Sequence, residues 1–215
     1  MIKFKRIKNL CYYECRKGEV MFVKGINIIN ISGKIKRKQY EYVFNEIMKK
    51  RDTEIIGILL IINSEGGSVT HTYAIYDFLK SIGLPITTVA LGACMNMAAL
   101  LFSLGTKRLV SNNALYMLNF ATDKGDLENL SRVKSSFEEE KQRYFMEEIV
   151  KTIAQNSKCS EETIKKICCD LNADNNKFLR KEELLKLGIA TDVFDGNPRK
   201  FLPDVISTFL AGTRY

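Results

Sequence analysis

"INSEGGSVTHTYAIYDFL", residues 62–79, joins the end of an apolar run to an amphipathic pattern through two adjacent glycines. The apolar run, IIGILLII at 55–62, shows no alternation with polar residues, which is typical of a strand covered on both faces in a parallel sheet. After Gly66 and Gly67, apolar residues recur at helical spacing as far as Gly83, a residue that commonly ends helices. The segment therefore predicts a strand, a glycine turn and a helix in succession.

Strand and helix patterns also alternate on both sides of this segment. Apolar and β-branched runs predict strands at 26–35 and 86–91. One helix is predicted at 40–50, where basic residues at its end suit the helix dipole, and another at 96–105, which ends at Gly105. The resulting β-α-β-α order is the pattern of an α/β fold with a parallel sheet and right-handed crossovers.

The C-terminal half begins with a short strand and continues mainly as helix. A strand is predicted at 115–120, a long helix at 127–155, and two short helices at 160–171 and 181–188. The long helix has a thin apolar seam and many charged residues, so it either meets another chain or packs on its own domain. Periodicity alone does not distinguish the two.

Composition favours one ordinary domain. Of the 215 residues, 46% are hydrophobic and 27% are charged, and no apolar stretch reaches the length of a membrane span. The net charge of +8 comes from lysines scattered among acids, which argues against nucleic-acid binding. We expect a basic N-terminal extension at 1–25, one domain at 26–195 and a C-terminal tail at 196–215.

The six cysteines form no CxxC pair, and there is a single histidine, so we expect neither a metal site nor a cofactor. Cys94 is expected at the end of a strand as a buried thiol, and His71 in a capping or solvated position early in a helix. An unorthodox peptidase that uses Cys94 as nucleophile and His71 as base is the alternative.

The order of these motifs resembles the proteolytic-subunit family of the Clp protease, whose fold is related to that of the crotonase enzymes. INSEGGSVTHTYAIYDFL resembles the family signature INSPGGSVTAGLAIYD, and KEELLKLGIATDVF at 181–194 resembles the family ending EA-x-x-x-GLID. The resemblance covers about residues 26–194. It implies a ClpP/crotonase-like α/β fold of repeated β-α-β units with a protruding handle helix at about 121–157.

The resemblance also locates the family's Ser-His-Asp triad. GACMNMAA at 92–99 matches the family's G-x-A-x-S-M-[GA]-A and places Asn96 at the serine. MLNFA places Asn119 at the histidine, or Leu118 if the register slips, and NNKFLRKEEL places Asn176 at the aspartate, with Asp174 as competitor. A carboxamide is not an activated nucleophile, so the resemblance implies no catalytic residues and a chain that is not an enzyme.

By the same resemblance, the backbone amides around Gly66, Gly67 and Met97 form an oxyanion-hole-like cradle. Self-cleavage at Asn96 through a succinimide is not expected, because the sequence gives no sign of strain or of an assisting histidine there. A binding module that holds an acyl-CoA thioester in a crotonase-like cradle is an alternative function.

The implied function is that of a non-catalytic, ClpR-type subunit. Such a subunit forms a heptameric ring alone or with active ClpP subunits, and contributes to the docking of a Clp ATPase unfoldase. Neither nucleic acid nor membrane is an expected partner. The implied location is a plastid-type organelle, an apicoplast or a chloroplast stroma, in preference to the mitochondrion or cytoplasm.

Overall fold

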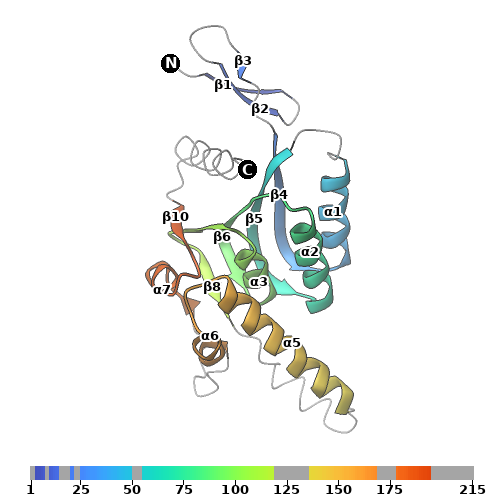
Figure 1. The fold of residues 1–215 in the computed structure, drawn as a ribbon, viewed down its shortest axis with the longest axis vertical. Helices are drawn as coiled ribbons and strands as arrows, with labels where there is room; N and C mark the ends of the chain where they lie inside the picture. The colour runs from blue at the N-terminus through green and yellow to red at the C-terminus, as the bar shows by residue number, and fades with distance from the viewer. Residues whose placement is uncertain are drawn as a thin grey trace.

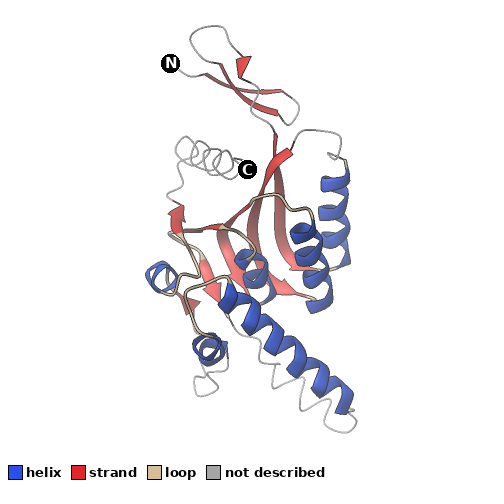
Figure 2. Cartoon of the chain, viewed as in Figure 1, coloured by secondary structure: helices blue, strands red, loops and turns tan. Residues whose placement is uncertain are grey.

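The computed structural model describes residues 3–7, 10–14, 20–21, 25–49, 55–118, 136–168 and 178–194. In this part of the chain a central sheet is covered on one side by helices (Figure 1, Figure 2). A separate antiparallel sheet near the N-terminus lies beyond the end at which the first long strand of the central sheet begins (Figure 1). It consists of β1 (Lys3–Ile7), β2 (Leu10–Glu14) and β3 (Val20–Met21).

The central sheet runs in the order β10-β7-β6-β5-β4, and β8 and β9 extend it from β6. Its described pairs are parallel except β8 with β9, as the alternating sequence pattern predicts. The strands are β4 (Gly25–Ile35), β5 (Ile55–Gly67), β6 (Ile86–Met95), β7 (Lys107–Ser111), β8 (Leu115–Met117), β9 (Phe178–Leu179) and β10 (Asp192–Phe194).

The helices follow the predicted segments with shifted ends. They are α1 (Arg37–Met48), α2 (Val69–Ser81), α3 (Met97–Ser103), α5 (Ser136–Gln155), α6 (Glu161–Cys168) and α7 (Lys181–Lys186). Gly66 and Gly67, predicted as the turn before a helix, are the last residues of β5. Gly83 and Gly188 follow α2 and α7 with positive φ, as predicted helix ends do.

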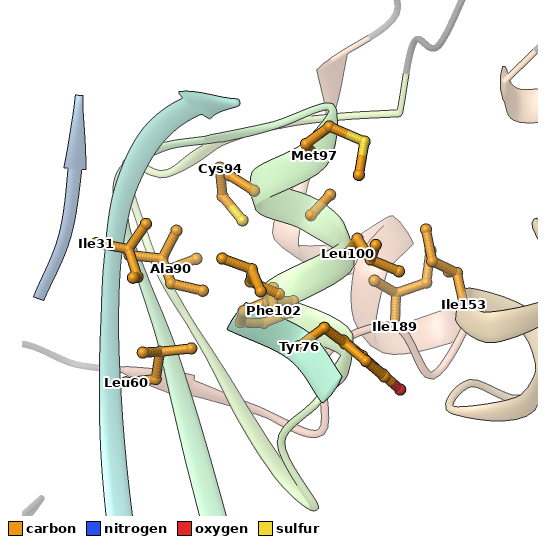
Figure 3. Packing of buried hydrophobic residues seen from close by; sticks show 14 of the residues in the cluster. Ile31, Leu60, Tyr76, Ala90, Cys94, Met97, Leu100, Phe102, Ile153 and Ile189 are labelled. Atoms are coloured by element: carbon orange, nitrogen blue, oxygen red, sulfur yellow. The ribbon is translucent and has the colours of Figure 1, made fainter. Parts of the chain in front are cut away.

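Strand β5 is buried on both faces. Leu60 is fully buried in the main core with the helices, and Leu59 is 2% exposed in a smaller cluster with Val89 and Leu109 on the opposite face. This arrangement confirms the prediction made from its unbroken apolar run. Figure 3 shows the main core, in which Leu100 and Phe102 of α3 lie among side chains of the sheet and of neighbouring helices.

Helix α3 is buried all around, since each of its residues from Met97 to Ser103 is inaccessible to solvent or nearly so. A helix that is apolar on every face needs neighbours on every side. It packs against β5, β6, α2 and α5. Its first residue is therefore held in a fixed position relative to the end of β5.

The long predicted helix is described from Ser136, and the predicted start at 127 lies outside the described residues. Its C-terminal part packs on its own domain through Ile149 and Ile153, whereas Tyr144 is 59% exposed. Helix α5 extends away from the sheet (Figure 1), in the manner predicted for a handle. The part around Ile149 and Ile153 thus fits packing on the chain's own domain, and the exposed Tyr144 fits contact with another chain.

Arg108 of β7 joins the loop that follows α3 to the segment that follows α7. Its buried guanidinium donates hydrogen bonds to the carbonyls of Gly105, Gly188 and Ile189 at 2.7–2.8 Å. Its main chain also exchanges hydrogen bonds with Thr191, where β10 begins to pair with β7. This single side chain ties the end of α3 to the segment that follows α7.

Candidate functional site

The candidate site lies at the junction between β6 and α3. Asn96 joins the two elements with φ 52° and ψ −121°, and it is the one non-glycine residue with positive φ in the described part of the chain. Such a conformation costs a side-chain-bearing residue about 1–3 kcal/mol and persists only where the surroundings impose it. The expectation that Asn96 is unstrained is therefore wrong, because sequence carries no direct record of a backbone torsion.

Three hydrogen bonds hold Asn96 in this conformation. Its backbone N–H donates to the Met117 carbonyl at 3.0 Å, and its carbonyl accepts from the Ala99 N–H at 2.9 Å. Its side-chain Nδ2 donates to the Glu65 carbonyl at 3.3 Å. The residue is thus bonded to β8, to α3 and to the end of β5, and each contact comes from a different part of the fold.

The glycine turn at the end of β5 faces this junction. A Cβ atom on Gly66 would lie 2.9 Å from the Met95 carbonyl oxygen and 3.0 Å from the Met97 nitrogen. These positions are too close for a side chain, so only glycine permits the approach, and its φ of +99° favours glycine independently. A Cβ on Gly67 would lie closer still to the backbone of Ile35, its partner in the pairing of β4 with β5.

The backbone amides of the predicted cradle have different surroundings. The Gly66 N–H donates to Ser64 Oγ at 3.0 Å, and Ser64 Oγ donates in turn to the Gly33 carbonyl at 2.6 Å. Met97 is the first residue of α3, a position whose N–H has no partner within a helix. Gly66 therefore acts as a spacer that lets Met97 face the turn, and the cradle assigned to Gly66, Gly67 and Met97 stays a prediction.

The other two predicted triad positions, Asn119 and Asn176, lie outside the described residues, as does Asp174. Leu118, the alternative for the first of them, is 2% exposed in the main core. Their described neighbours Met117 and Phe178 face each other in the pairing of β8 with β9. Met117 of β8 also accepts the Asn96 N–H, so β8 lies beside the junction of β6 and α3, and β9 pairs with β8 there.

Cys94 and His71 do not form a nucleophile–base pair. Cys94 is fully buried, and burial raises the pKa of its thiol above the ordinary value of 9.0. His71 belongs to the start of α2, where its Nδ1 lies 2.8 Å from the Oγ of Ser68, the N-cap residue. Among the described hydrogen bonds none joins the two residues, so the structure supports the buried and capping roles predicted for them.

Sequence reasoning missed two residues that shape the turn. Asn63 Oδ1 accepts the Ala93 N–H at 3.0 Å, and so links β5 to β6 just before the elbow. Ser64 supplies the hydroxyl between Gly66 and Gly33 described above. Both stand in the quoted INSEGG motif, and their polar side chains at the end of an apolar strand were the available signal.

In the described part of the chain, no group of three or more His, Cys, Asp or Glu residues is placed to hold a metal ion. No described helix combines the length and the apolar character needed to cross a membrane.

Four features occur together at this site: a parallel strand, a strained residue, a buried helix, and a glycine turn that faces the start of the helix. This is the strand–turn–helix elbow at which α/β hydrolases and related folds place a reacting residue beside backbone amides. A family model described as Clp protease matches residues 20–197. The chain belongs to the Clp protease family.

Individual relatives agree with this assignment. The chain is 33% identical over 141 residues to ATP-dependent Clp protease proteolytic subunit 1 of Corynebacterium glutamicum, and equally to subunit 2 of Corynebacterium jeikeium. In each case the match covers 64% of this chain and 64% of the relative's length. A mutant ClpP1 from Listeria monocytogenes has the same fold, with a TM-score of 0.63 at 21% identity, over 80% of this chain and 93% of that one.

The prediction that this chain is not an enzyme is wrong by these comparisons, because the relatives that it matches are named proteolytic subunits. That prediction rested on three side chains, two of which lie outside the described residues.

Proposed function

We propose that this chain is a subunit of the proteolytic core of an ATP-dependent Clp protease. The observation that carries the proposal is the approach of Gly66 to the start of α3, where a Cβ would lie 3.0 Å from the Met97 nitrogen. The Gly66 N–H is engaged by Ser64 Oγ, so the Met97 N–H, which faces the glycine turn, is the donor that can bind a carbonyl oxygen there. A peptide carbonyl held there is the ligand that the family assignment favours.

The backbone N–H donor of the cradle would stabilise negative charge on the bound group. When a peptide carbonyl gains a tetrahedral carbon, its oxygen becomes negative, and fixed N–H donors stabilise that charge more than the neutral carbonyl. The Met97 N–H is held by the burial of α3, so no reorganisation is needed when the oxygen arrives. The Asn96 carboxamide, adjacent to it, adds polar atoms to the same site.

We further propose that the chain assembles into a heptameric ring with its own copies or with other proteolytic subunits, and that a Clp ATPase docks on the ring. Exposed large apolar side chains support this part of the proposal, since such residues mark interaction surfaces when they gather. Three of them lie on α1, each 36–40% exposed: Tyr42, Phe44 and Met48, of which Phe44 and Met48 are one helical turn apart on the same face.

The test is native mass spectrometry of the purified chain, alone and with proteolytic subunits from the same source, together with peptide hydrolysis in the presence of a Clp ATPase and ATP. We expect a ring-sized assembly that contains this chain and hydrolyses peptide when the ATPase is present. A monomer that joins no assembly and leaves hydrolysis by the mixture unchanged would overturn the proposal.

A double variant gives this test its control. Tyr42→Ser with Met48→Ser removes apolar surface from α1 and is expected to weaken the assembly. Lys38→Ser, on an exposed position of the same helix, is expected to leave the assembly intact. Equal loss of assembly in both variants would show that the effect is not specific to the apolar side chains.

A further inference from the structure

The backbone torsions of Asn96 place its Cβ beside the backbone nitrogen of Met97. Because Cβ lies about 120° from the backbone nitrogen around Cα, a ψ of −121° leaves the Asn96 Cβ and the Met97 nitrogen nearly eclipsed about the Cα–C bond. In a helix the same torsion is about 80°, and in an antiparallel strand about −105°. The elbow therefore holds the side chain of Asn96 on the same side as the next backbone nitrogen.

We propose that Asn96 is a site of spontaneous deamidation, in which the Met97 backbone nitrogen attacks Cγ of Asn96. A bond forms between the Met97 nitrogen and Cγ, and the bond between Cγ and Nδ2 breaks. Nδ2 leaves as ammonia and takes the proton that the Met97 nitrogen gives up. The product is a five-membered succinimide ring made of the Met97 nitrogen and the carbonyl carbon, Cα, Cβ and Cγ of Asn96.

Water then opens the ring at one of its two carbonyl carbons. Its hydroxyl adds to the carbon and its proton returns to the Met97 nitrogen. Opening at Cγ leaves aspartate in a normal backbone, and opening at the main-chain carbonyl carbon leaves isoaspartate, in which the chain runs through Cβ. No oxidant, reductant or other co-reactant is required.

The fold prepares this reaction in two ways. A succinimide is nearly planar, so the torsion that the ring needs is already set, and the cost of reaching it is included in the stability of the folded chain. Gly66 also restrains the two reacting groups, because it packs so closely that a Cβ there would lie 3.0 Å from Asn96 Cβ and from the Met97 nitrogen alike. This close contact keeps the side chain and the nitrogen in their relative position.

Conversion would change the contacts of the site. The Asn96 Nδ2 now donates to the Glu65 carbonyl at 3.3 Å. A carboxylate has no hydrogen to donate, so its oxygen would meet the Glu65 carbonyl as a second acceptor. The deamidated chain is therefore expected to loosen the contact between the glycine turn and the elbow, and to carry a negative charge beside the Met97 N–H.

The test compares the folded chain with the same chain unfolded in urea, and follows each asparagine by peptide mass mapping in heavy-oxygen water. Asn45 is the internal reference, because it is exposed and lies within α1 with helical backbone. We expect Asn96 to convert about tenfold faster in the folded chain than in the unfolded chain, because the fold has already set the strained torsion that the ring requires. Asn45 is expected to convert more slowly in the folded chain.

Heavy oxygen in both aspartate and isoaspartate at position 96 identifies the succinimide route. Asn96→Gln, which would need a six-membered ring, is expected to show no comparable conversion in the folded chain. Slower conversion of Asn96 in the folded chain than in urea would overturn the proposal. Scission between Asn96 and Met97 in place of ammonia loss would also overturn it, because that product requires attack by the side-chain nitrogen on its own carbonyl carbon.

Discussion

Gly66 and Met97 approach so closely that a Cβ on the glycine would lie 3.0 Å from the methionine nitrogen. This relationship joins the two halves of the candidate site, because Gly66 ends β5 together with Gly67 and Met97 begins α3. A side chain at position 66 would therefore have to move the sheet away from the helix.

Gly66→Ala is therefore expected to destabilise the domain. The new methyl group would meet the Met95 carbonyl, and alanine would have to adopt a φ of +99°. Strain and overpacking together predict a loss of about 2–4 kcal/mol in the free energy of unfolding. Gly83→Ala is the matched control, since Gly83 also has positive φ but a Cβ there would meet no atom within 4 Å. Its loss is expected to be about 1–2 kcal/mol, and urea denaturation measures both.

Arg108→Met is expected to detach the segment after α7. The variant leaves the carbonyls of Gly105, Gly188 and Ile189 without their buried donor. Unsatisfied buried acceptors predict a loss of about 2–4 kcal/mol in the free energy of unfolding. Lys107→Met, at the adjacent and less buried position, is expected to change it by no more than about 0.5 kcal/mol. Equal effects in urea denaturation would contradict the role assigned to the Arg108 hydrogen bonds.

The central sheet is accessible to sequence reasoning because long strands carry a strong apolar signal. The apolar runs predict strands β5 and β6 but not the short β9 and β10, since two or three residues cannot show a period. The strands of the N-terminal sheet are also missed. Their basic residues indicate only an extension, because the charges mask any alternation.

The candidate site is predictable in position but not in geometry. The motif around Asn96 places the residue at the start of a helix, and the structure agrees. Its torsions are not predictable, because they are imposed by Met117 and Glu65, which are distant in sequence. Non-local contacts of this kind decide a conformation that local propensity would reject.

Two buried tyrosines allow a matched test of hydroxyl burial. The Tyr116 hydroxyl is fully buried and has no hydrogen-bond partner among the described residues, whereas the Tyr76 hydroxyl accepts from Asn156 Nδ2 at 3.3 Å. Tyr116→Phe is expected to raise the free energy of unfolding by up to about 1 kcal/mol, and Tyr76→Phe to lower it by about 1 kcal/mol. Urea denaturation of both variants measures the difference, and a clear loss in Tyr116→Phe would show that its hydroxyl is satisfied.

The stability of the domain is expected to fall above about pH 9, and Cys94 is expected to contribute to that fall. Burial raises the pKa of its thiol from the ordinary value of 9.0, so above this pH the unfolded chain loses the proton while the folded chain keeps it. Unfolding then releases a proton, and the free energy of unfolding decreases as the pH rises. Below pH 9 both states hold the proton, and Cys94 adds no pH dependence.

Cys94→Ala separates this contribution from that of the other groups that titrate at alkaline pH. The variant is expected to be less stable than the wild type at pH 8, because it leaves a small cavity in the core. Between about pH 8 and pH 10.5, however, it is expected to lose less stability than the wild type does. Cys159→Ala is the comparison. Burial raises the pKa of the Cys159 thiol too, but this residue is only partly buried at the edge of the main core, so its removal is expected to change the slope less than Cys94→Ala does. Urea denaturation at both pH values measures the slopes, and parallel slopes for wild type and Cys94→Ala would mean that the Cys94 thiol titrates alike in the folded and unfolded chains.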